Sequence, residues 1–315
     1  MQTTIKVFFL LFIVSPCISQ IDWEKYEAIS MVSDNSPVKL AKTITASFDT
    51  QEEKAEAIYY WVTHNISYDY KLYEKMKKSK GNKKKYSKKE LEQKERKEIA
   101  KTLKSKKGIC QQYSNVFKAL CEAVGIQCIL VSGYAKANPM RSGLGEKHAW
   151  NAVYLNDNWH LIDATFGAGY VDDDKKFTYS FDGGYFKSDP NAFKMNHLPT
   201  QSKWQLSEEL MSKDNYKNNP GVGSGYFKYE ISGLSPATYK ISATKTEPLV
   251  IRFSSVKDLE ELNIVNLRKL KEVTGEVLKE VSQYTITLDT AELKPGVYGV
   301  YSGQKLLFSH RISVN

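Results

Sequence analysis

The segment Lys107–Leu120 constrains the fold of this chain more than any other stretch. Gly108 and Cys110 directly precede a run with helical apolar spacing, which Gly125 ends. The pattern predicts an amphipathic helix whose first turn carries the Cys110 thiol, where the helix dipole and unpaired N–H groups favour the thiolate. Gly108 would leave room there for a substrate backbone. Cys110 is therefore a candidate nucleophile, and its N–H is a candidate oxyanion donor.

A predicted β-hairpin supplies a base and a group that orients it. Residues 148–155 and 158–163 have the composition of strands, and the two-residue turn Asn156-Asp157 joins them. In that register His148 and Asp163 are diagonal neighbours on one face, about 7–8 Å apart at the backbone. A turn one residue longer would place them on opposite faces. The register therefore predicts that Asp163 orients the His148 ring and that His148 serves Cys110.

The N-terminus has the features of an export signal. Lys6 precedes an apolar run over residues 7–14 that is too short to span a bilayer, and small residues before Gln20 suit a cleavage site. We predict a signal peptide over residues 1–19, an exported protein (periplasmic, cell-surface or secreted), and no transmembrane helix in the mature chain. A buried N-terminal helix is one alternative. A lipid anchor at Cys17 is another, which Pro16 disfavours.

The cysteine count supports a free thiol. Removal of Cys17 with the signal leaves three cysteines, and an odd number in an exported protein leaves at least one unpaired. Cys121 and Cys128 could form a disulfide or remain reduced and buried. Either outcome leaves Cys110 free.

Metal chemistry finds little support in the sequence. A zinc site built from Cys110, Cys121, Cys128 and His148 lacks a close Cys-x-x-Cys pair, so we predict no metal and no cofactor. The remaining histidines are isolated along the sequence and receive no role; they are His64, His160, His197 and His310.

The positive charge is concentrated in one segment. The chain carries a net +9, whereas residues 71–107 contain 17 Lys or Arg and 5 Asp or Glu, a net +12, so the remainder carries −3. We expect Lys75–Lys89 to be a mobile solvated loop and Glu90–Leu103 to be helical. A nucleic-acid site would interleave arginine and aromatic residues with the charge, and Arg96 is the segment's one arginine. We predict no nucleic-acid partner; anionic envelope polymers are an alternative partner for this lysine-rich insertion.

The chain divides into two parts after the signal. Glu52–Asn65 predicts a helix capped at Asp49-Thr50, and together with the hairpin it indicates an α+β domain over residues 20–218. Asn218–Gly225 is the clearest linker. The region 219–315 predicts an all-β, immunoglobulin-like sandwich. Its expected strands are Tyr226–Ile231, Tyr239–Ala243, Leu249–Phe253, Leu262–Leu267, Tyr284–Leu288, Gly296–Tyr301 and Leu306–Val314.

Several blocks resemble the transglutaminase-like superfamily. They are Lys107-Gly108-Ile109-Cys110, His148-Ala149-Trp150-Asn151 and Trp159-His160-Leu161-Ile162-Asp163-Ala164-Thr165, with an upstream match at residues 58–69. Residues 185–206, including His197-Leu198-Pro199, resemble the kyphoscoliosis peptidase-type branch, whose members often append β-sandwich domains. The resemblance covers residues 50–210 and implies a papain-like core with a Cys110, His148 and Asp163 triad. Ala164 stands where many relatives have proline.

The expected function is cysteine-dependent acyl transfer on a protein or peptide substrate. We predict a thiol protease or amidase that acts on peptide or carboxamide bonds. A protein-glutamine transglutaminase that uses the same triad is an alternative, and a non-catalytic envelope-binding protein is another. A second oxyanion donor is not identifiable from the sequence.

Overall fold

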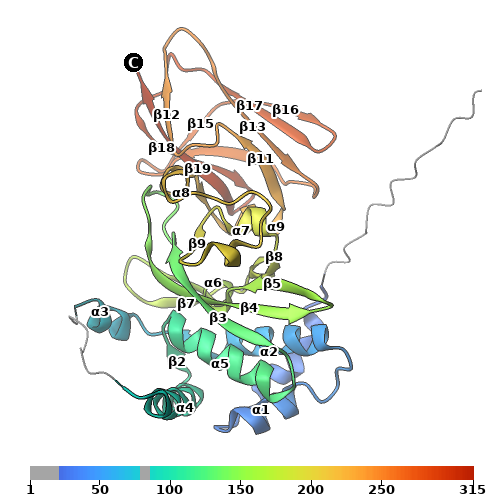
Figure 1. The fold of residues 1–315 in the computed structure, drawn as a ribbon. Coiled ribbons are helices and arrows are strands. Elements are labelled where there is room, and N and C mark those ends of the chain that lie inside the picture. Colours follow the sequence, from blue (N-terminus) through green and yellow to red (C-terminus); the bar gives the residue numbers. More distant parts are fainter. Residues whose placement is uncertain (1–20, 79–85) are drawn as a thin grey trace, which may run out of the picture.

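The computed structural model describes residues 21–78 and 86–315. The predicted signal peptide and the centre of the predicted Lys75–Lys89 loop lie outside the described residues. A helical layer lies beneath an antiparallel sheet, and two further sheets from the C-terminal third lie on the other side (Figure 1). No helix in the described ranges is both long enough and apolar enough to cross a membrane.

Six elements form the helical layer. They are the 3-10 helix η1 (Glu24–Met31), α1 (Pro37–Ile44), α2 (Gln51–Asn65), α3 (Tyr70–Lys78), α4 (Lys88–Ser105) and α5 (Cys110–Ala123). The predicted first helix is confirmed as α2, which Thr50 caps through a capping box with Glu53. The helix α2 is buried on more than one face, because η1, α1 and α5 all pack around it. Its Trp61 is fully buried.

The lysine-rich insertion is more ordered than the sequence suggested. The loop prediction is wrong at both ends, because residues 75–78 belong to α3 and residues 88–89 to α4. The Asp69 carboxylate accepts the Leu72 N–H at the start of α3, and Lys77 pairs with Glu146 of the central sheet at 3.0 Å. The helix predicted over 90–103 is confirmed as α4.

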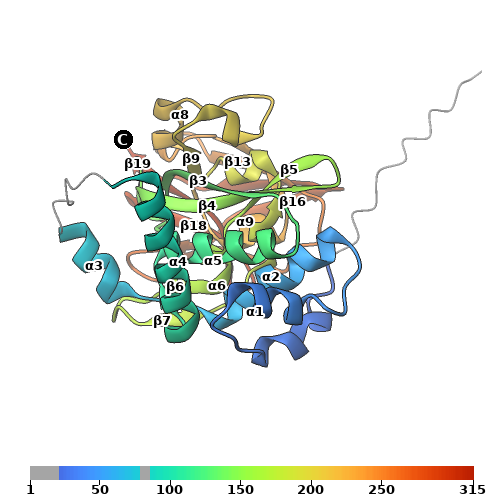
Figure 2. The ribbon, with the colours of Figure 1, turned by 60° about the horizontal axis from the view of Figure 1, so that its bottom comes forward.

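A five-stranded antiparallel sheet forms the centre of the N-terminal part. Its order is β8-β5-β4-β3-β9, with bounds Phe186–Ser188, Asn158–Ile162, Glu146–Leu155, Cys128–Ala135 and His197–Pro199. Figure 2 shows α5 between α2 and α4 against this sheet. The Ser114 hydroxyl of α5 donates to the Ala149 carbonyl at 3.0 Å, and the Asn151 side chain donates to the Ser114 carbonyl at 3.1 Å. These bonds fix the start of α5 against β4.

The hairpin register is confirmed. Leu155 pairs with Asn158. Asn156 and Asp157 have φ of 49° and 62°, as a two-residue type I′ turn requires. Asp163 directly follows β5 and caps the short helix α6 (Ala164–Ala168) through its side chain.

The C-terminal region contains two sheets. The first has the order β11-β13-β17-β16, with bounds Ile231–Ser235, Leu249–Ser255, Gln283–Leu288 and Glu276–Glu280. The second has the order β10-β19-β18-β14-β15, with bounds Gly221–Val222, Lys305–Val314, Gly296–Ser302, Leu262–Asn266 and Lys271–Val273. A further strand, β12 (Lys240–Ala243), pairs with β19 in parallel. The Phe253 and Phe308 rings meet between the two sheets at 5.1 Å.

Two predictions near the linker need correction. Residues 224–228 form the helix α9, so the strand predicted over Tyr226–Ile231 is wrong and β11 begins only at Ile231. The predicted linker is packed: Val222 pairs with Phe308, and a Cβ at Gly221 would clash with the Pro139 carbonyl. Close backbone approach explains the glycines that looked like linker residues.

Short elements complete the fold. They are β1 (Ser67–Tyr68), β2 (Lys107–Gly108), β6 (Gly169–Val171), β7 (Phe177–Tyr179), η2 (Gly183–Tyr185), α7 (Pro190–Phe193), η3 (Ser202–Gln205) and α8 (Lys213–Asn218).

Candidate active site

Cys110 is the first residue of α5, as predicted. Burial by itself raises the pKa of the thiol, but a hydrogen bond with His148, the His148 charge and the Ala149 backbone lower it below its ordinary value overall. Gly108 has a different role from the one expected. A Cβ there would lie 2.6 Å from Gln112 Cβ, so the glycine accommodates the first turn of α5 and not a substrate.

His148 lies on β4 between Cys110 and Asp163. Its Nε2 is 2.6 Å from Asp163 Oδ2, so Nδ1 is the ring nitrogen left for Cys110. Burial disfavours the imidazolium, yet the Asp163 charge, the hydrogen bond to Asp163 and the contact with Cys110 raise the pKa of His148 to about 10. A raised histidine pKa beside a lowered thiol pKa indicates a thiolate–imidazolium pair.

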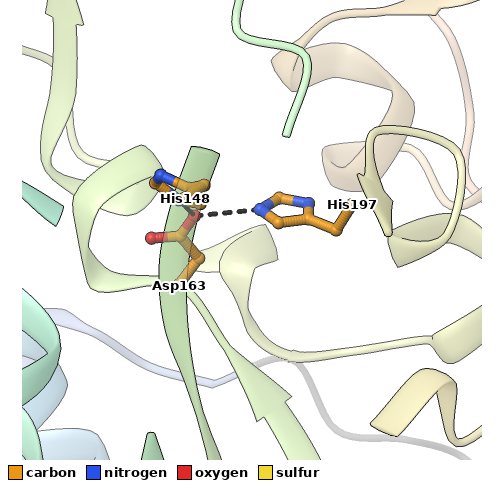
Figure 3. A group of neighbouring side chains, drawn as sticks. All are labelled: His148, Asp163 and His197. Atoms are coloured by element: carbon orange, nitrogen blue, oxygen red, sulfur yellow. Dashed lines mark hydrogen bonds and ion pairs between the residues drawn. The ribbon is translucent and has the colours of Figure 1, made fainter. Parts of the chain in front are cut away.

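The Asp163 carboxylate is fully buried and receives four donors. Its Oδ1 accepts the N–H groups of Thr165 at 2.8 Å and Phe166 at 3.2 Å. Its Oδ2 accepts from His148 at 2.6 Å and from His197 at 3.0 Å (Figure 3). Burial would raise the pKa of Asp163, but His148 and His197 hold it well below the usual range. The carboxylate is therefore anionic and its orientation is fixed.

His197 is the residue that the sequence interpretation missed. It begins β9, which pairs with β3 so that His197 lies opposite Ala135, and its side chain is fully buried. His197 follows Asp163 by 34 positions, the residues between them contain only short elements, and no local periodicity fixes their path. The resemblance at His197-Leu198-Pro199 was the one available signal, and it did not suggest this contact.

Three of these groups also have the composition of a metal site. The ligand atoms of His148, Asp163 and His197 all lie within 4.8 Å of one another. The Nε2 atoms of His148 and His197, however, already donate hydrogen bonds to the same oxygen, Asp163 Oδ2. A metal ion would have to replace both hydrogen bonds. The two imidazoles and the carboxylate already satisfy one another's hydrogen-bonding groups without a metal.

The site opens into a cleft of about 730 Å³. Cys110 and His148 lie in its wall, and Tyr68, Tyr70 and Tyr73 contribute aromatic surface from β1 and α3. The start of β19 adds Lys305 from the C-terminal region. Both the lysine-rich insertion and the C-terminal sheets therefore help to shape the cleft, whose volume is in the range of sites that bind small ligands or peptide segments.

The fold and this arrangement define a transglutaminase-like, papain-type domain of mixed α/β structure. Residues 38–164 match the model of the transglutaminase-like superfamily, so this part of the chain is a transglutaminase-like domain. Within that superfamily, the chain is similar to the kyphoscoliosis peptidase branch, as the sequence blocks predicted.

Two relatives carry this assignment. Human (Homo sapiens) kyphoscoliosis peptidase is 28% identical over 269 residues, which is 79% of this chain and 38% of the relative. The mouse (Mus musculus) protein is 32% identical over 196 residues, which is 60% of this chain and 27% of the relative. The chain thus spans well under half the length of either. A solved TGase structure is 18% identical over 52% of this chain and 37% of its own, with a TM-score of 0.32.

Proposed function

We propose that this protein is a cysteine-dependent acyl-transfer enzyme that hydrolyses peptide or carboxamide bonds. One observation carries the proposal: the Cys110 thiol at the start of α5 contacts His148, whose other ring nitrogen is held by the buried Asp163. A thiolate nucleophile, an imidazolium that can donate a proton and a carboxylate that fixes the ring are the three parts such chemistry needs.

The reaction follows from this arrangement. The Cys110 thiolate attacks the carbonyl carbon, and the C–N bond breaks as His148 Nδ1 gives its proton to the departing amine. The resulting thioester is then attacked by water, from which His148 takes a proton, and the carboxylic acid leaves as Cys110 regains its thiolate. Asp163 keeps the ring in place through both steps and remains ionised.

The developing oxyanion needs two donors. The Cys110 N–H is one, and we propose the Tyr68 hydroxyl as the second. Tyr68 lies in the cleft wall beside Cys110, and among the described residues its hydroxyl has no hydrogen-bond partner. Burial, followed by the nearby Cys110 charge, raises the pKa of Tyr68, so the phenol keeps its proton. Its strand β1 pairs with β2 so that Tyr68 lies opposite Gly108, two residues before the nucleophile.

Water is the acceptor that we favour over an amine. Cys110 and His148 line a cleft of about 730 Å³ that several elements border, and water is present there without a dedicated binding site, whereas an amine acceptor needs one. Transfer to a lysine amine on the same triad is the alternative outcome of the test.

The test is selective alkylation of the purified protein with iodoacetamide at pH 6. Cys121 and Cys128 are buried and reduced, so they serve as internal controls in the same digest. We expect fast labelling of Cys110 and at least a tenfold slower reaction in His148→Ala. Slow, equal labelling of all three cysteines would refute an activated thiolate. A peptide library incubated with and without a primary amine then separates hydrolysis from amine transfer by product mass.

We also propose that the C-terminal region is an immunoglobulin-like module. The strand orders support this: β11-β13-β17-β16 matches an A-B-E-D sheet, and β19-β18-β14-β15 matches a G-F-C-C′ sheet. The parallel pairing of β12 with β19 gives an extra edge strand. Export remains a proposal supported by the apolar N-terminal sequence, and fractionation of cells with N-terminal sequencing of the mature protein tests it.

A further inference from the structure

His197 is the buried polar side chain that the proposed reaction leaves unused. We propose that His197 is a positioning residue that shares Asp163 Oδ2 with His148, fixing the carboxylate and limiting how strongly it holds the His148 imidazolium. The inference rests on the proposed function, because it concerns the strength of His148 as an acid. It is carried by two imidazoles that converge on one carboxylate oxygen, at 2.6 Å and 3.0 Å (Figure 3).

The His197 ring has little freedom to leave this position. It stacks on Phe193 with ring centroids 3.9 Å apart and planes 17° apart, and the Trp150 ring meets it edge-on at 5.1 Å. Its Nδ1 lies 2.6 Å from Asn196 Oδ1. A neutral ring with its hydrogen on Nε2 therefore requires the Asn196 amide to present its N–H₂ group, as donor, to Nδ1. Aromatic packing and two polar contacts therefore aim Nε2 at Asp163.

The protonation of His197 follows from its neighbours. An ionised carboxylate oxygen can only accept, so the Nε2 that faces Asp163 carries a hydrogen. Burial lowers the pKa of His197 to about 4, although Asp163 works in the opposite direction. The ring is therefore a neutral donor at neutral pH, whereas His148 on the same oxygen is a cation.

A neutral donor on the shared oxygen weakens the hold of Asp163 on His148. The His197 N–H stabilises the Asp163 carboxylate in both protonation states of His148. The stabilisation is largest after His148 has lost its proton, because no imidazolium then compensates the negative charge of Asp163. It therefore favours proton loss and keeps the pKa of His148 below the value that Asp163 alone would impose. A general acid works best when its pKa is not far above the operating pH, so this contact assists protonation of the leaving amine.

The other titratable groups around Asp163 and its two histidines do not change charge near neutral pH. Cys110 from α5 is the thiolate partner already described. Four tyrosines approach Asp163, and burial raises the pKa of each, so they stay neutral; they are Tyr59, Tyr68, Tyr113 and Tyr185. The titration of His148 therefore reports chiefly on Asp163, Cys110 and His197.

Histidine titration by NMR tests the inference on the full-length protein with 13C-labelled histidine. The five histidines give few signals, and His148→Ala assigns the one of interest. We expect His197→Leu to raise the pKa of His148 by about one unit, and His197→Gln, which retains an N–H donor, to restore most of the wild-type value. His310→Leu is the matched control, because His310 is about as buried and, among the described residues, its ring nitrogens bond only the Thr238 carbonyl.

An unchanged or lowered pKa of His148 in His197→Leu would overturn the inference, since a purely structural role predicts lost stability without this rise. The wild-type protein offers a second test that no folding defect can obscure. His197 should remain neutral with its hydrogen on Nε2 from pH 5 to 9, and a titration near 6.5 or an Nδ1–H tautomer would refute the shared-oxygen arrangement. Failure of the proposed function is distinct, because it appears as unselective alkylation of the wild type.

Discussion

Asp163→Asn isolates the electrostatic part of the proposed site, because the two side chains have the same shape. The substitution removes the negative charge and turns one oxygen into an N–H₂ that faces two imidazole donors. The pKa of His148 stands at about 10 against an ordinary 6.5, a rise of about 3.5 units, to which Asp163 contributes more than Cys110. At 1.36 kcal/mol per unit the whole rise corresponds to roughly 5 kcal/mol. If Asp163 supplies half or slightly more, about 2–3 kcal/mol of imidazolium stabilisation is lost.

The assay is the rate of iodoacetamide reaction at Cys110 at pH 6, followed by mass spectrometry. A loss of about 2–3 kcal/mol corresponds to a rate fall of roughly 100-fold, within a factor of a few. Asp189→Asn is the matched control, because Asp189 also caps a short helix through its carboxylate but touches neither histidine. A less than fivefold fall in Asp163→Asn, with urea unfolding showing a native fold, would refute the claim that Asp163 sustains the ion pair. An equal fall in the control would do the same.

Three further predictions concern the oxyanion, the sheet and acid stability. Tyr68→Phe should lower turnover of a peptide substrate about 100-fold without slowing alkylation of Cys110, because only turnover forms an oxyanion; parallel losses in both assays would contradict this. Gly133→Ala should destabilise the protein by about 2–4 kcal/mol in urea unfolding, since its Cβ would lie 2.6 Å from the Trp150 ring and would meet the β9 backbone; an unchanged midpoint would argue against that packing. His197 and His310 have folded pKa values lowered by burial to about 4, below the unfolded 6.5. Their neutral forms therefore stabilise the fold fully above pH 6.5, and this contribution is lost as the pH falls through 4. The loss amounts to about 2.5 kcal/mol for each histidine at pH 4.5. Equal urea midpoints at pH 7 and 4.5 would contradict this.

The local part of the site could be predicted from the sequence. The start of α5 at Cys110 follows from glycine, cysteine and helical apolar spacing within one segment. The shared face of His148 and Asp163 follows from a two-residue turn whose geometry fixes the strand register. In each case the interacting residues are close along the chain, so periodicity and turn chemistry are enough to relate them.

The lysine-rich insertion and the linker show where local composition misleads. Lysine-rich sequence suggested a solvated loop over Lys75–Lys89, yet residues 75–78 extend the helix α3 and Lys77 ties that helix to Glu146. Glycines around Gly221 suggested a linker, yet they permit close packing against Pro139. A single sequence does not reveal what a lysine or a glycine will touch in another element.

The sequence by itself determined that a helix begins at Cys110 and that His148 and Asp163 share one face of a hairpin, because a helix start and a two-residue turn are local features. Only the tertiary structure decided that His197 completes the donors around Asp163. That contact depends on β9 pairing with the far edge of β3, and on a path through short elements that no repeat pattern describes. Pairing of distant strands reflects the packing of the whole core, and the burial of His197 among Phe193 and Trp150 exists only once that core has formed.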